Sequence, residues 1–458
     1  MLAVLLFIAA IAGGKLLSNR LQYSRVAPDI KHWTLLDYAH MIVKALRPVI
    51  KAQKGKGIER FFKAQYLDFI PAGEWQTASK TTVTFGGDVI DWIEFDEESR
   101  NHLWDELGEY LFSSDIMFAN LEMPIDITKP VRFPYDMKSV KLDKTFFKAP
   151  KFNGSQNTFE ALQYAGRRPD IISTATNHCL NMRETGVSNT LDLLDAKGVQ
   201  HVGTARTPFD QDTIPVIERN GIRVAFLAYT FSLNQDSIPA GKDHLVNIVP
   251  VNDANADITL IRKHIALAKA QGADIIVASL HWGYDQEVYP TTNIIDNAHA
   301  IIRAGVDIIV GHHPHILQPL EKYTYRDPSN GQEKAGLIAY SMGELLSYSP
   351  MSYLLSPIPA VWLSAVLRVE ITKGIRHGEE SVGISQVKLL PFYKLGKKTK
   401  EGKYAVRFID LRKTLNNLIH AKQCYNLSIQ EINNMVRAHA YLEEFIYPED
   451  SSKILEPL

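Results

Sequence analysis

Blocks of apolar residues alternate with amphipathic stretches along the central part of the chain. Apolar runs of strand length occur at residues 83–88, 116–122, 170–176, 222–229, 273–280, 306–310 and 336–341. Between several of them, apolar residues recur at helical spacing, over residues 186–198, 258–272 and 297–305. Near-continuous apolar strands separated by amphipathic helices predict an α/β fold with both faces of the sheet covered.

The regions outside this alternation have a different pattern. Residues 124–157 contain four prolines and are predicted to form a long loop that faces a substrate. A polar, glycine-containing stretch at 374–380 is a predicted boundary, followed by a strand at 387–392 and a basic segment at 394–403. In the tail, Ser428 and Glu431 have the spacing of a helix capping box.

The first 80 residues predict attachment to a membrane. An uncharged apolar run at 2–14 is shorter than the roughly 20 residues of a spanning helix and fits a signal segment or short anchor. A buried N-terminal helix is the alternative. Twelve Lys and Arg against five Asp and Glu in residues 1–80 suit an anionic membrane surface, and their position after the apolar run favours a cytoplasmic orientation. We therefore divide the chain into an anchor (1–20), a basic neck (21–80), a main domain (81–375) and a C-terminal extension (376–458).

Composition excludes some classes of protein. The chain has 458 residues, 45% hydrophobic and 22% charged, with a net charge of -1, which is ordinary for a globular protein and predicts no nucleic-acid partner. Its two cysteines, Cys179 and Cys424, are too few for a disulfide framework or a cysteine-based zinc site.

Five of the predicted strands end in residue types that bind metals. The strand ends carry Asp88, Glu122, Asn177 with His178, His281, and the pair His313 and His315. Taken singly, each has an ordinary alternative, such as a turn residue, a loop acid, a cap or a core histidine. Together they supply carboxylate, amide and imidazole donors at one edge of a sheet, which predicts a site for divalent metal ions.

The order of these motifs resembles a known family. Gly87-Asp88, Asn120-Leu121-Glu122, Asn177-His178, His281-Trp282-Gly283 and 311–315 (Gly-His-His-Pro-His) are similar to the CapA family of capsule, or poly-γ-glutamate, biosynthesis proteins. That family is a branch of the calcineurin-like metallophosphoesterase superfamily, and the resemblance covers about residues 81–375. It implies a layered α/β/β/α sandwich anchored on the extracytoplasmic face of the membrane, the opposite of the orientation that the basic residues favour.

The resemblance also implies roles for the strand-end residues. Two divalent ions, of Mn, Fe or Zn, would be bridged by Glu122. One ion would be held by Asp88 and His315, and the other by Asn177, His281 and His313. His178 would be the general acid, and His312 and Asp285 would act from outside the ligand set.

Four positions depart from the family pattern. Ile90 stands where the superfamily commonly has a histidine, and Asn181 where the family usually has an aspartate three residues after the Asn-His histidine. Gly343-Glu344 replaces Gly-Asn after the last core strand, and Asp285 replaces a glutamate. None of these changes removes a predicted metal ligand.

The resemblance implies a membrane-associated, metal-dependent hydrolase in the biosynthesis of poly-γ-glutamate or another envelope polymer. Its substrate would be an acidic polymer or a phosphoester. Two alternatives stay open: a non-catalytic, polymer-binding component of a synthesis or export complex, and a phosphodiesterase that shares only the fold.

Overall fold

The computed structural model describes most of the chain. It covers residues 48–69, 76–93, 95–132, 151–327, 331–349, 359–376, 378–400, 402–420 and 426–455, with Thr34, Asp37 and Lys44. The predicted anchor, Cys424, much of the neck and half of the proline-containing loop lie outside these residues. In the part that is described, no helix is both long enough and apolar enough to cross a membrane.

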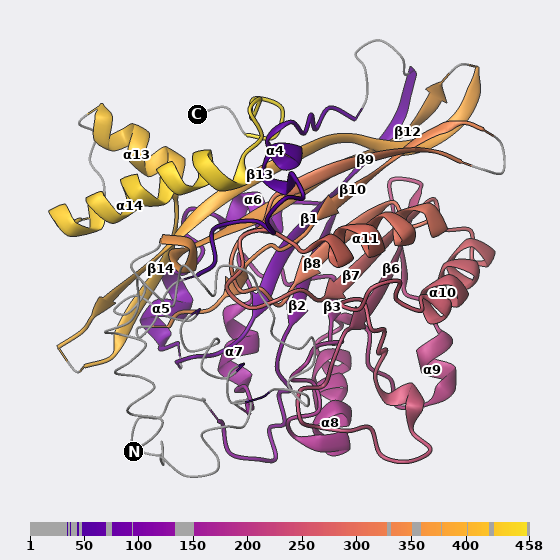
Figure 1. The fold of residues 1–458 in the computed structure, drawn as a ribbon. Coiled ribbons are helices and arrows are strands. Elements are labelled where there is room, and N and C mark those ends of the chain that lie inside the picture. The colour runs from indigo at the N-terminus through magenta and orange to yellow at the C-terminus, as the bar shows by residue number, and fades with distance from the viewer. Residues whose placement is uncertain are drawn as a thin grey trace.

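Two β-sheets form the centre of the molecule (Figure 1). The larger sheet has the order β14-β13-β12-β1-β2-β3-β4, with β11 beside β1, and the smaller has the order β5-β6-β7-β8-β10-β9. The strands of the larger sheet are β1 (Gln76–Val89), β2 (Ile116–Leu121), β3 (Ile171–Ser173), β4 (Gln200–Val202), β11 (Glu344–Leu346), β12 (Leu363–Arg376), β13 (Glu379–Lys398) and β14 (Tyr404–Asp410). Those of the smaller are β5 (Val216–Arg219), β6 (Ile222–Thr230), β7 (Ile275–His281), β8 (Ile308–His312), β9 (Leu320–Arg326) and β10 (Glu333–Ala339).

Helices lie on both sides of the two sheets. They are α4 (Ile58–Lys63), α5 (Glu97–His102), α6 (Gly108–Phe112), α7 (Gln156–Ala161), α8 (Arg183–Ala196), α9 (Pro208–Asp212), α10 (Thr259–Ala270), α11 (Thr292–Ala304), α13 (Leu411–Ile419) and α14 (Ile429–Tyr441). Short 3-10 helices span Asp243–Leu245 and Pro359–Trp362, and a π-helical turn spans Leu442–Ile446. In Figure 1, α10 and α11 lie on the side of the smaller sheet, and α5 and α7 on the opposite side.

The sheets pack face to face through alternate residues of their strands. In β2, Ile116 and Phe118 belong to the core between the sheets, whereas Met117 and Ala119 belong to a second core under the helices. The ring of Phe118 stacks on that of Phe226 in β6, with centroids 5.9 Å apart. The predicted α/β/β/α sandwich is therefore confirmed.

Individual elements agree with the sequence to different degrees. Helices α8 and α10 lie within three residues of the predicted bounds, and the capping box of Ser428 and Glu431 at the start of α14 is confirmed. Helix α11 begins five residues before the predicted start at 297, and β13 is 20 residues long, far beyond the predicted 387–392. The long strand is possible because residues 379–393 of β13 pair with β12 and residues 392–398 pair with β14.

Segments on both sides of the main domain pack against it. Phe62 of α4 is buried, with its ring centroid 5.4 Å from that of Tyr340 at the end of β10. Two lysines from the predicted basic segments are buried as well: Lys44 pairs with Glu287, and Lys394 with Glu344. These two ammonium groups are therefore not available to lipid or to an acidic polymer.

Candidate metal centre

The strand register brings the predicted ligands to one end of the two sheets. In the larger sheet, Asp88 of β1 lies beside Asn120 of the parallel strand β2. In the smaller sheet, His281 of β7 lies beside His312 of the parallel strand β8. Parallel strands point their carboxyl ends the same way, so side chains from both sheets meet at this end.

Two glycines allow the backbones to approach closely here. A Cβ on Gly87 would lie 2.0 Å from the carbonyl oxygen of Gly343, and one on Gly311 would lie 1.9 Å from that of Tyr340. Both distances are far below van der Waals contact. Any larger residue would therefore push apart the strands that carry the metal-binding types of side chain.

The turn after β8 has an unusual backbone conformation. His313 has φ 96° and His315 has φ 60°, in the left-handed region that residues other than glycine seldom adopt. Such residues cost about 1–3 kcal/mol each and are concentrated at functional sites. The turn aims both imidazoles at the carboxylates of the centre.

One group of contacts surrounds Asp88. Its Oδ2 lies 3.8 Å from His315 Nδ1 and accepts a hydrogen bond from the His313 backbone N–H (3.1 Å). Its Oδ1 accepts from the Asn120 amide (2.8 Å) and lies 3.3 Å from His312 Nδ1. His312, predicted to act from outside the ligand set, thus faces Asp88.

A second group connects Asn177, His281 and His313. Asn177 Oδ1 lies 3.0 Å from His281 Nε2, and its Nδ2 lies 3.4 Å from His313 Nδ1. Asp285 is near the same turn, 3.5 Å from His313 Nε2 and 3.5 Å from His315 Nε2.

Glu122 lies between the two groups. Its Oε1 is 3.5 Å from His281 Nε2 and 3.5 Å from His315 Nε2. The side chain is completely buried, yet neither oxygen has a hydrogen-bond partner among the described residues. Glu122, His313 and His315 each offer a donor atom within 4.8 Å of the other two, a set that draws on both predicted ion sites.

Two further residues complete the surroundings of the centre. Asn120 lies between Asp88 and His281, with its Nδ2 3.4 Å from His281 Nδ1. Glu344 Oε1 lies 3.4 Å from His315 Nδ1, and its Oε2 accepts a hydrogen bond from Lys394 Nζ (2.7 Å). Neither was assigned a role from the sequence, although Asn120 is two residues before Glu122 and so faces the same side.

The electrostatics favour bound cations. Burial raises the pKa of Glu122 well above its usual value, and the carboxylates of Asp88, Asp285 and Glu344 add to this effect. Burial lowers the pKa of His281 well below its usual value, which keeps the imidazole neutral and able to bind a metal. Burial opposes protonation of His315 as well, but attraction to Glu122 and Glu344 raises its pKa.

These observations fit a divalent metal site. A buried carboxylate without hydrogen bonds is costly, and cations remove that cost. Carboxylate, amide and neutral imidazole donors suit Mn, Fe and Zn alike. The residues present could therefore hold metal through Asp88, Glu122, Asn177, His281, His313 and His315.

His178 sits next to this set in a defined hydrogen-bond environment. Its Nδ1 lies 2.9 Å from Asn181 Oδ1, which also accepts from the Phe152 backbone N–H (2.8 Å). Asn181 Nδ2 donates to Asp236 Oδ2 (3.1 Å), so the amide orientation is fixed and His178 Nδ1 must carry the proton. Burial lowers the pKa of His178 to about 4, and among the described residues no carboxylate pairs with the ring directly.

Comparison with known proteins gives the family. Residues 82–349 match the family described as Bacterial capsule synthesis protein PGA_cap. The chain is 28% identical over 274 residues to Capsule biosynthesis protein CapA of Bacillus anthracis, covering 58% of this chain and 60% of that one. It is 30% identical over 177 residues to PGA biosynthesis protein CapA of Bacillus subtilis, covering 38% and 42%.

A solved structure of a hypothetical protein from Thermus thermophilus is 15% identical and covers 67% of this chain and 99% of that one, with a TM-score of 0.34. The chain spans between two fifths and three fifths of the length of the two Bacillus relatives. The family match extends over more than half of the chain and includes every residue of the candidate centre. This protein belongs to the bacterial capsule synthesis protein family.

Proposed function

We propose that this protein is a metal-dependent hydrolase with two divalent ions that acts in the synthesis of a capsule or envelope polymer. The observation that carries the proposal is the position of Glu122. Neither of its buried oxygens has a hydrogen-bond partner among the described residues, and Oε1 lies 3.5 Å from His281 of one donor group and 3.5 Å from His315 of the other. A carboxylate in that position can serve both ions at once.

The bound ions would polarise a phosphoryl or carbonyl oxygen of the substrate and activate water. The chain's own residues do the rest. Asp88 and His315 would hold one ion, and Asn177, His281 and His313 the other. Asn120 donates a hydrogen bond to the Asp88 carboxylate, and His312 lies beside it. Glu344 and Lys394 form a buried pair that holds His315 in place.

The proposed substrate class rests on analogy with the relatives. One Bacillus relative is named for capsule biosynthesis and another for PGA biosynthesis. By analogy, the substrate here is poly-γ-glutamate, another acidic polymer or a phosphoester intermediate. We also propose that the apolar run at 2–14 and the basic residues after it hold the protein at the extracytoplasmic face of the membrane, beside a synthase or export complex.

One observation favours the non-catalytic alternative. A general acid needs a proton to give, but His178 is buried, its Nδ1 is paired with the neutral Asn181, and its pKa is about 4. A polymer-binding component would not need a protonated imidazole. Catalysis by His178 would require the substrate or the ions to change its surroundings.

The test is hydrolysis by purified, metal-loaded protein. We expect turnover of p-nitrophenyl phosphate, bis(p-nitrophenyl) phosphate or γ-glutamyl-p-nitroanilide, lost in Glu122→Gln. The matched control is Glu98→Gln, which changes an exposed glutamate in α5. A fully metal-loaded wild-type protein that hydrolyses none of the three would leave the binding component as the function.

A second set of variants tests His178. His178→Ala should keep its metal and lose turnover by about 10²–10⁴-fold, the usual contribution of an acid–base group. The exchange Asn181→Asp with Asp236→Asn places a carboxylate beside His178 without setting two carboxylates 3.1 Å apart. This double variant should raise the pH above which turnover declines. Unchanged turnover in His178→Ala would contradict a catalytic role for the imidazole.

A further inference from the structure

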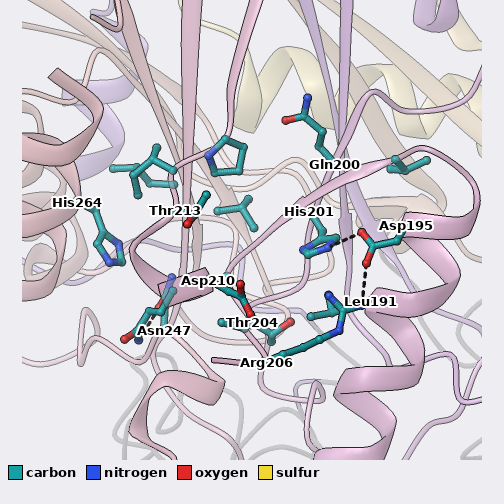
Figure 2. Close-up of a pocket in the computed structure, with 18 of the residues that line it drawn as sticks. Leu191, Asp195, Gln200, His201, Thr204, Arg206, Asp210, Thr213, Asn247 and His264 are labelled. Carbon is teal, nitrogen blue, oxygen red and sulfur yellow. Dashed lines mark hydrogen bonds and ion pairs between the residues drawn. The ribbon is translucent and has the colours of Figure 1, made fainter. Parts of the chain in front are cut away.

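A cavity of about 420 Å³ lies away from the metal centre, where the edges of the two sheets meet. We call it the edge cavity. Its walls come from β4 at the edge of the larger sheet, from the segment before β5 and from β6 in the smaller sheet, and from helices α8, α9 and α10. Figure 2 shows His264, Thr213 and Asn247 on one side, and His201, Asp195 and Arg206 on the other. Its volume is within the usual range for small-molecule sites.

His264 is a buried hydrogen-bonding group on the wall of this cavity. It is 1% exposed, and its Nδ1 lies 2.9 Å from the hydroxyl of Tyr229, which is fully buried. No other partner for the Tyr229 hydroxyl is found among the described residues, so we expect the hydroxyl to donate to His264 Nδ1. This bond satisfies the hydroxyl proton and the Nδ1 lone pair. The proton of the neutral imidazole is then on Nε2.

The Nε2 atom of His264 has no hydrogen-bond partner within the described part of the chain. The carboxylate oxygen Asp212 Oδ1 lies 3.8 Å away, too far for a hydrogen bond. Leaving a buried donor unpaired costs about 1–3 kcal/mol. His264 therefore brings a buried donor without an acceptor to the wall of the cavity.

The charged residues on the other side of the cavity are already paired. Arg206 donates to Asp192 Oδ1 (2.6 Å) and Asp195 Oδ2 (2.8 Å), and His201 Nε2 lies 3.0 Å from Asp195 Oδ1. With Asp210 also on the wall, carboxylates outnumber the guanidinium. An anionic ligand would be repelled, so the edge cavity does not suit an acidic polymer.

The remaining lining suits a ligand with hydroxyl groups and an apolar face. Gln211 Nε2 donates to Asn247 Oδ1 (3.0 Å), which leaves the Gln211 carbonyl as an acceptor beside the carboxylates of Asp195 and Asp210. Ile214 and Leu227 are buried and provide an apolar floor. A sugar ring has hydroxyl donors for these acceptor oxygens and C–H faces for the apolar side chains.

We propose that the edge cavity binds an uncharged, hydroxyl-rich ligand of one or two sugar rings, with His264 Nε2–H donating to a ligand oxygen. The ligand is either a free sugar or the end of a glycan, which share this chemistry. The site is separate from the metal centre and does not depend on the proposed hydrolase activity.

The test is calorimetric titration of the full-length protein with glucose, N-acetylglucosamine, cellobiose and glucuronate. At least one neutral sugar should bind, and preferential binding of cellobiose would indicate a glycan end. Glucuronate differs from glucose by one carboxylate. Its affinity should be lower by about tenfold or more, because its charge would be placed among carboxylates.

Three variants locate the binding. Gln200→Trp, at an exposed position on the rim in β4, should abolish it without disturbing the core. His264→Gln should weaken it about tenfold, the value of one hydrogen bond to a buried donor. Binding should be unchanged in Glu122→Gln and in His102→Gln, which alters an exposed histidine in α5. No binding of any neutral sugar up to its solubility limit, or full binding in Gln200→Trp, would overturn the proposal.

Discussion

The metal centre and the edge cavity arrange their charged groups in opposite ways. At the metal centre, carboxylates from four segments lie close together, and Lys394 is the ammonium partner of one of them, Glu344. Within the described part of the chain, both oxygens of Glu122 lack hydrogen bonds. At the edge cavity, Arg206 is neutralised by Asp192 and Asp195. The excess of carboxylates at the metal centre favours bound cations, and the paired charges at the edge cavity favour an uncharged ligand.

The largest expected effect comes from a close backbone contact at the metal centre. Gly311→Ala would place a Cβ 1.9 Å from the Tyr340 carbonyl oxygen. We expect a loss of unfolding free energy of about 4 kcal/mol or more, because backbone cannot move aside as a side chain can. Gly198→Ala, on the wall of the edge cavity, with open space around the site but φ +69°, should cost about 1 kcal/mol. Equal costs in denaturant titrations would contradict the close approach.

The ion pairs of the two regions, buried at the metal centre and exposed at the edge cavity, give the next effect. Lys394→Met leaves the Glu344 carboxylate buried without its ammonium partner and should cost roughly 3 kcal/mol in metal-free protein. Arg206→Met removes a cation from two half-exposed aspartates and should cost less than about 1 kcal/mol. Adding Glu344→Gln to Lys394→Met should recover most of the loss. A larger cost for Arg206→Met would reverse the comparison.

The smallest effect is a pH dependence at the edge cavity. Burial lowers the pKa of His264 to about 4, from an ordinary value of 6.5. The unfolded chain therefore binds this proton more readily, and stability is lost as the pH falls from about 6.5 towards 4. Over that pH range, the unfolding free energy of His264→Gln should fall by about 1–2 kcal/mol less than that of the wild type, as measured by thermal or urea unfolding. Identical acid sensitivity would indicate that the imidazole is not buried as described.

The α/β class and the strand-end residues could be predicted because both depend on local pattern, whereas the four-layer arrangement came from the family resemblance. Alternation along β2 separates Ile116 from Met117, and the ends of parallel strands must meet at one edge. The sequence could not predict that Glu344 and Lys394 lie close to His315. The strand that carries Glu344, β11, is only three residues long, and it reaches the centre through its pairing with β1. Lys394 resembled a surface lysine within a basic run. His264 lies within the predicted helix at 258–272 and was assigned no role from the sequence, so nothing in the sequence indicated the edge cavity.

The central claim is that Glu122 serves two metal ions. It is tested most directly by calorimetric titration of metal-stripped protein with Mn²⁺ or Zn²⁺. The account predicts two ions per chain for wild type, weak or absent binding at both sites in Glu122→Gln, and one retained site in His281→Ala. Two ions bound by Glu122→Gln with wild-type affinity, or none bound by the wild type, would contradict it.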